Sequence, residues 1–194
     1  MTLMIIGLLI FFGTHSLNIF APDWREKQLQ QRGTIPFKVV YALVSIGGLW
    51  LAIVGYGEMR MTAVPLWNPP VGLRHLVALL MLPSFILLAA AYIPANHLKA
   101  RLGHPMLMAV KIWAFAHLLV NGRLGDIIFF GAFLAWAVVL YICLKKQDRA
   151  RGTVYPAGSM LGTVSSVIVG TVLYVVFAMY LHIYVAGVSA IGTM

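Results

Sequence analysis

Residues 126–144 read DIIFFGAFLAWAVVLYICL, an apolar run of 19 residues followed by the basic stretch KKQDRAR at 145–151. A helix rises about 1.5 Å per residue, so about 20 apolar residues carry it across ~30 Å of hydrocarbon. The composition agrees, because 61% of the 194 residues are hydrophobic and 10% are charged. Soluble domains carry roughly 25% charged residues. The sequence therefore predicts an integral membrane protein with the lipid bilayer as its solvent.

Further apolar runs of similar length lie on both sides of this one. Together they predict an all-α bundle of about six transmembrane helices, which form a single transmembrane domain over 1–194. The expected spans are 2–21, 37–57, 73–93, 105–121, 126–144 and 160–188. Pro105 stands where a proline is favoured, in the first turn of a helix.

The basic residues are distributed unevenly among the connections. Connections one, three and five hold ten of the 14 Lys and Arg residues, whereas connections two and four hold three. Because Lys and Arg accumulate on the cytoplasmic side, the odd connections are expected there, with both termini periplasmic. The same rule accounts for the net charge of +9, so no nucleic-acid partner is expected.

Several kinds of catalytic site have no counterpart in the sequence. The single cysteine, Cys143, excludes an intrachain disulfide and a cysteine-rich metal site. The sequence has no H-E-x-x-H, no P-loop, no G-x-S-x-G and no pair of carboxylates within a span. These gaps argue against a hydrolase and against a proton-coupled pump.

Two histidines lie inside expected spans, where an ionisable side chain is unfavourable and therefore marks a candidate site. His15 stands in the first span and His117 in the fourth. Each one alone is also consistent with a neutral imidazole that is hydrogen-bonded within the bundle. Two neutral imidazoles on different spans with apolar surroundings also describe the axial ligands of a bis-histidine haem.

Other polar residues near the spans have simpler interpretations. Lys111, within the fourth span, can extend its amine to the membrane surface, pair with a buried acid, or meet a haem propionate. His182, near the end of the sixth span, is a third candidate ligand. His75 and His97 are read as interfacial and loop residues.

One segment carries most of a resemblance to a known family. It reads GHPML at 103–107, WAFAHLL at 113–119 and then Asn121-Gly122, and it resembles the NnrU family of bacterial membrane proteins. Supporting matches are His15-Ser16, Tyr56-Gly57, Asn68-Pro69-Pro70 and Arg74-His75-Leu76. Family members often carry arginine before the His-Pro pair, where this chain has Gly103.

The resemblance implies a location and a biological role. NnrU proteins belong to the bacterial inner membrane and are associated with denitrification, where nitrite and nitric oxide reductase expression or activity depends on them. The family is also distantly similar to 15-cis-zeta-carotene isomerase, a membrane haem b protein with two histidine ligands. By position those ligands match His15 and His117, and an alternate cysteine ligand of the isomerase matches Ala114 here.

Three hypotheses follow for the function. The first is a haem b protein that supports denitrification, with His15 and His117 as iron ligands, Trp113 and Phe115 as pocket walls, Lys111 as a propionate partner, and nitric oxide as a small ligand. The second is a haem-dependent cis–trans isomerase of a carotenoid or other polyene. The third is a non-catalytic membrane scaffold or assembly factor whose histidines are structural.

Overall fold

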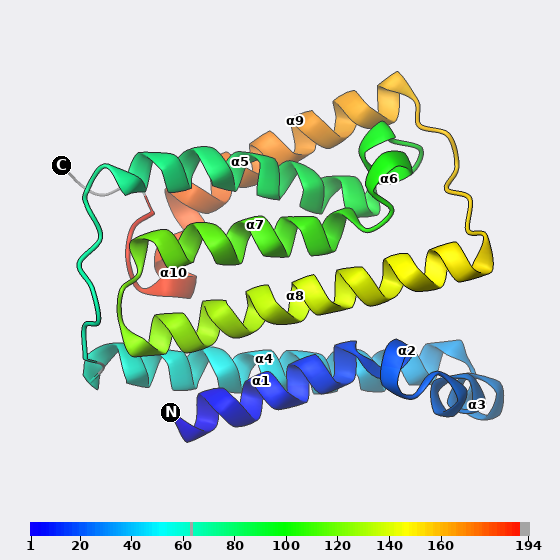
Figure 1. The fold of residues 1–194 in the computed structure, drawn as a ribbon, viewed down its shortest axis with the longest axis horizontal. Helices are drawn as coiled ribbons and strands as arrows, with labels where there is room; N and C mark the ends of the chain where they lie inside the picture. The colour runs from blue at the N-terminus through cyan, green and yellow to red at the C-terminus, as the bar shows by residue number, and fades with distance from the viewer. Residues whose placement is uncertain (63, 191–194) are drawn as a thin grey trace. The chain divides into compact units, whose positions relative to one another are not determined.

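The computed structural model describes residues 1–62 and 64–190, and helices dominate it (Figure 1). The expectation of an all-helical protein is confirmed. The elements are α1 (Thr2–His15), α2 (Leu17–Phe20), α3 (Pro22–Arg32), α4 (Thr34–Thr62), α5 (Leu73–Tyr92), α6 (His97–Leu102), α7 (Pro105–Val120), α8 (Leu124–Arg151), α9 (Met160–Val176), the π-helical segment η1 (Phe177–Leu181) and α10 (His182–Ala186).

In the described part of the chain, four helical stretches are long and apolar enough to cross a membrane. They are Thr34–Met61, Leu73–Tyr92, Leu124–Arg151 and Met160–Ala186. The other two apolar helices are shorter, with 14 residues in α1 and 16 in α7. At about 1.5 Å per residue these span ~21 Å and ~24 Å, less than the hydrocarbon thickness of ~30 Å. A helical membrane protein is thus supported, while the count of six spans stays a prediction.

The helices form two compact units. The N-terminal unit contains Met1–Leu66 and Arg123–Ala132, and the C-terminal unit contains Trp67–Gly122 and the chain from Phe133 onward. Helix α8 begins in the first unit and continues in the second.

Within the N-terminal unit, α1 lies along α4 (Figure 1). Glycines allow this close approach, because a Cβ at Gly7 would collide with the backbone of Ala52 and one at Gly55 with the backbone of Met4. In a membrane the hydrophobic effect does not drive helices together, because lipid tails are as apolar as the helix surface. Small residues at a crossing allow the close van der Waals packing that association then depends on.

The expected first span, 2–21, is divided in two. Helix α1 ends at His15 and α2 begins at Leu17, with Ser16 at φ −98° and ψ 0° between them. The change of helix therefore comes directly after the candidate ligand His15.

A polar helix, α3, occupies the segment that was expected to be a loop. Pro22 stands in its first turn, Asp23 favours its positive N-terminal end, and Arg32 favours its negative C-terminal end. Gly33 follows at φ 81°, a left-handed conformation that glycine adopts without strain. Residues that suit the two ends of a helix, rather than apolar periodicity, define α3, which explains why hydropathy did not predict it.

Within the C-terminal unit, α5 packs against both α7 and α9 (Figure 1). The Ser84 hydroxyl of α5 donates to the carbonyl oxygen of Ala109 on α7 at 2.9 Å. On the α9 side, Gly170 lies so close to the Ile86 backbone that a Cβ there would collide with it. The expected start of a helix at Pro105 is confirmed.

The expected last span, 160–188, contains a change of helical geometry. Helix α9 gives way to the π-helical segment Phe177–Leu181, and α10 begins at His182. Short π-helical segments within α-helices are frequent at functional sites. Here the segment ends directly before the candidate ligand His182.

Candidate functional site

His117 is held in one tautomer by its own helix. The ring nitrogen Nδ1 lies 2.8 Å from the carbonyl oxygen of Trp113, one turn earlier on α7. A carbonyl oxygen can only accept a hydrogen bond, so in the neutral ring Nδ1 carries the proton and Nε2 carries the lone pair. The Asn121 side chain donates to the His117 carbonyl oxygen at 2.9 Å.

His15 repeats this arrangement in the N-terminal unit. Its Nδ1 donates to the carbonyl oxygen of Phe11 at 2.9 Å, one turn earlier on α1. Its ring also lies against Phe11 and Tyr41, with centroid separations of 4.1 and 5.3 Å. The aromatic contacts restrict the orientation of the imidazole, and the carbonyl again makes Nε2 the acceptor nitrogen.

This donor set fits axial ligation of iron. Histidines that bind metals usually donate their other ring N–H to a carbonyl or carboxylate, which fixes the tautomer and orients the ring. Both His15 and His117 meet that requirement through Nδ1. His15 belongs to the N-terminal unit and His117 to the C-terminal unit, so their pairing across one haem stays a prediction.

A cavity of about 70 Å³ lies beside His117 within the C-terminal unit. His182 lines the same cavity and its Nδ1 lies 2.7 Å from the carbonyl oxygen of Val188. The structure thus brings two of the sequence-predicted candidates, His117 and His182, to one cavity. Its lining consists of Arg74, Ala78, Met81, Phe85, His117, Tyr174, Phe177, Ala178, His182 and Ala190.

Lys111 has an aromatic partner that the sequence analysis did not identify. Its ammonium nitrogen lies 3.8 Å from the centroid of the Tyr141 ring on α8. At that distance the cation interacts with the π face of the ring. This contact is an alternative to the three partners expected for Lys111, namely the membrane surface, a buried acid and a haem propionate.

The two expected pocket walls lie in different surroundings. Trp113 packs edge-on against Phe133 at a centroid separation of 5.2 Å. Phe115 is 49% exposed and stands about 200° around α7 from His117. Neither residue lines the cavity beside His117, so their part in a haem pocket stays a prediction.

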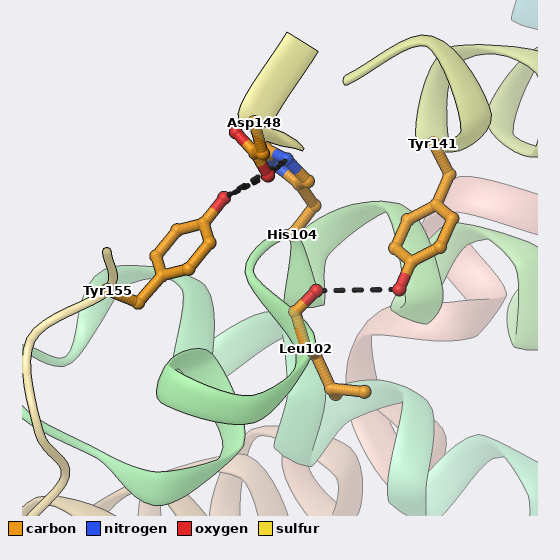
Figure 2. Close-up of polar contacts among 5 residues, drawn as sticks. All are labelled: Leu102, His104, Tyr141, Asp148 and Tyr155. Atoms are coloured by element: carbon orange, nitrogen blue, oxygen red, sulfur yellow. Dashed lines mark hydrogen bonds and ion pairs between the residues drawn. The ribbon is translucent and has the colours of Figure 1, made fainter. Parts of the chain in front are cut away.

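A polar cluster joins the beginning of α7 to the end of α8 and the loop that follows (Figure 2). His104 Nε2 lies 2.9 Å from Asp148 Oδ2, and the Tyr155 hydroxyl donates to the same oxygen at 2.6 Å. The Tyr155 oxygen is also 3.2 Å from His104 Nε2. Burial, followed by the hydrogen bond and the negative charge of Asp148, raises the pKa of Tyr155 to about 12.

Gly103 is required by the packing of this cluster. Its φ of +75° favours glycine, and a Cβ there would lie 2.8 Å from the Tyr155 ring. The sequence pointed to the His104-Pro105 pair as part of the family resemblance, but to neither Asp148 nor Tyr155 as its partners. No local motif points to them, because they follow His104 by 44 and 51 positions.

A second polar contact was also missed, in the N-terminal unit. The Tyr56 hydroxyl donates to Asp126 Oδ1 at 2.6 Å, and the Arg123 backbone N–H donates to Asp126 Oδ2 at 2.9 Å. Asp126 is 3% exposed, and the Tyr56 ring stacks on Phe129 at 4.8 Å. The carboxylate thus satisfies a backbone donor at the start of α8 and anchors α4 to it, which is a structural role.

Over residues 1–62 and 64–190, no group of three or more His, Cys, Asp or Glu side chains comes together as a metal-binding cluster. A haem iron takes most of its ligands from the porphyrin and needs only axial side chains from the protein. The candidate pair His15 and His117 is therefore a different kind of site from such a cluster.

Comparison with known proteins identifies the family. A family model described as NnrU protein matches residues 3–190, nearly the whole chain. Searches of curated proteins and of solved structures gave no match. With a match of this extent, the chain belongs to the NnrU family.

Proposed function

We propose that this protein is a multi-pass protein of the bacterial inner membrane that binds haem b through His15 and His117 and supports denitrification. The topology proposed with it has six spans and both termini in the periplasm, which places the ten basic residues of the odd connections in the cytoplasm. The link to nitrite and nitric oxide reductase expression or activity rests on NnrU family membership.

The tautomer of the two histidines carries this proposal. Each Nδ1 donates to a carbonyl oxygen of its own helix, and each Nε2 is left as the acceptor nitrogen. Such a nitrogen would offer its lone pair to iron with no proton to lose. The rings are held by neighbouring aromatic residues, so little conformational entropy is lost when a ligand is bound.

When bound, haem would supply a redox-active iron able to bind nitric oxide. The chain's own residues would hold the group and control access to it. The cavity beside His117 has a volume of about 70 Å³, which is room for a small ligand. It suits a diatomic ligand, and Arg74 and His182 are the charged and polar side chains that such a ligand would meet.

The residues around His117 also bear on the isomerase hypothesis and on the scaffold hypothesis. A polyene is far larger than the cavity beside His117, which favours a small ligand over the isomerase alternative. Ala114 also stands where the isomerase has its alternate cysteine ligand. A scaffold or assembly factor would need neither imidazole as a ligand.

Absorption spectroscopy of purified protein tests the proposal. We would express the wild type, His15→Ala, His117→Ala and the matched control His75→Ala with ample haem, and record oxidised and reduced spectra. His75 is exposed and not among the proposed ligands. We expect a Soret band with sharp reduced α and β bands in the wild type and in His75→Ala, lost or shifted in the two other variants.

Other outcomes would contradict the proposal in distinct ways. A wild-type protein that stays colourless after haem titration would support the scaffold hypothesis. Spectra that change with His117→Ala but not with His15→Ala would reject the pair while retaining a haem site. Isomerisation of a pure cis polyene by the reduced haem-loaded protein would support the isomerase alternative.

A further inference from the structure

The N-terminal unit contains a groove of about 470 Å³ at the place where α2, α3 and the beginning of α4 meet. Figure 1 shows these three elements beside one another. The walls of the groove are mostly apolar, with Leu17, Trp24, Phe37, Val40 and Val44 among the lining residues. Such a surface binds hydrocarbon better than any polar solute.

The charged residue and the amide side chain that line the groove belong to α3, and the hydroxyls of Thr14 and Tyr41 come from α1 and α4. Arg32 and Gln28 line it, and the guanidinium carbon of Arg25 lies 6.0 Å from the centroid of the lining residue Phe37. Within the described ranges, no ion pair joins Arg25 or Arg32 to an acidic side chain. The groove therefore combines an apolar wall with cations that have no carboxylate partner.

Helix α3 has the character of a helix that lies at the membrane surface. It is polar and 11 residues long, and Trp24 on it is 50% exposed. Tryptophan and arginine are both favoured at the level of the lipid headgroups, where a ring meets hydrocarbon and a cation meets phosphate. The helix it packs against, α4, is long and apolar enough to span the bilayer.

We propose that this groove is a binding site for one anionic phospholipid. An acyl chain would lie against Phe37, Val40 and Val44, and the headgroup phosphate would accept hydrogen bonds from Arg32 and Gln28. A guanidinium pairs with phosphate through two parallel N–H donors, which gives geometric selectivity as well as charge attraction. The acyl chains of a zwitterionic lipid match the apolar wall equally well. Such a lipid carries no net charge, however, so it leaves the positive charge of the arginines uncompensated.

Native mass spectrometry after reconstitution tests the site. The protein would be placed in bilayers with equal amounts of phosphatidylglycerol and phosphatidylcholine, extracted into mild detergent, and its retained lipids counted. We expect one retained phosphatidylglycerol, and a preference that Arg32→Gln lowers about fivefold, the equivalent of about 1 kcal/mol per cation at an anionic surface.

Two further variants separate the site from general effects. Lys27→Gln removes the same charge from the same helix at an exposed residue that does not line the groove, so we expect the preference to remain. Val40→Trp fills the apolar wall, so we expect retention of both lipids to fall. Circular dichroism of each variant confirms that it has folded.

Three results would overturn this assignment. Equal retention of the two lipids by the wild type would mean ordinary surrounding lipid only. An equal effect of Lys27→Gln and Arg32→Gln would mean general electrostatic attraction without a site. Loss of haem absorption in Arg32→Gln with lipid retention unchanged would make the groove part of a haem pocket; the lipid proposal itself does not depend on haem.

Discussion

Replacing Tyr155 by phenylalanine removes one hydroxyl from the cluster of His104, Asp148 and Tyr155 and keeps the aromatic ring. The hydroxyl donates to the Asp148 carboxylate at 2.6 Å. A hydrogen bond to a charged group contributes about 1.5–3 kcal/mol. The side chains of His104 and Asp148 are 22% and 17% exposed, so water can replace part of the lost bond. We therefore expect the C-terminal unit to lose about 1–2 kcal/mol of stability.

Equilibrium unfolding in mixed micelles, followed by near-ultraviolet circular dichroism, measures this loss. Tyr184→Phe is the matched control, because Tyr184 is 86% exposed and its hydroxyl should contribute little. A double-mutant cycle of Tyr155→Phe with Asp148→Asn should give a coupling energy of about 1 kcal/mol or more. A Tyr155→Phe variant as stable as Tyr184→Phe, with no coupling to Asp148, would refute this account of the cluster.

The ionisation of Tyr155 gives a second readout of the same contact. Burial and the Asp148 carboxylate raise the pKa of Tyr155 from 10.0 to about 12. Because the pKa is raised in the folded state, the stabilisation is complete below pH 10 and is lost as the pH rises through about 12. Asp148→Asn should lower this pKa. Ultraviolet difference titration against Tyr155→Phe would measure it, and an unchanged value would contradict the pairing.

Two further predictions concern one helix contact in the N-terminal unit and one cation–π contact in the C-terminal unit. Gly7→Ala places a methyl group against the facing helix backbone, so we expect about 1–3 kcal/mol of destabilisation by overpacking. Gly13→Ala, where nothing lies within 4 Å, should be neutral or stabilising; similar unfolding midpoints for both would contradict the close α1–α4 contact. Lys111→Met should lose about 0.5–2 kcal/mol through the Tyr141 ring, and a loss that persists fully in a Tyr141→Leu background would exclude that contact as its cause.

Hydropathy along the chain was sufficient to predict the long apolar helices. The stretch 126–144 lies within α8, and the expected start at Pro105 is the start of α7. The ends of the helices differ more from the expected spans, because α4 and α8 continue beyond their apolar segments to Thr62 and Arg151. Polar residues extend these helices, since backbone hydrogen bonding continues after the hydrocarbon-matching segment has ended.

Part of the candidate site was also accessible from sequence. An ionisable residue within an apolar run is recognisable locally, which is how His15, His117 and Lys111 were found. Their partners were not accessible in this way. Tyr141 was unidentified as the partner of Lys111, and the cavity shared by His117 and His182 was unexpected.

The sequence by itself therefore determined that this is a helical membrane protein of the NnrU family, and which histidines stand within its apolar segments. Composition, local hydropathy and short motifs carry that information, because each depends on neighbouring residues. The tautomers of His15 and His117 are set locally, by a carbonyl oxygen one turn earlier on the same helix. Only the tertiary structure decided the cavity that His117 shares with His182 and the joining of His104 to Asp148 and Tyr155. Those features depend on how helices pack across tens of residues of chain, and side-chain contacts at such separations leave no periodic signal in the sequence.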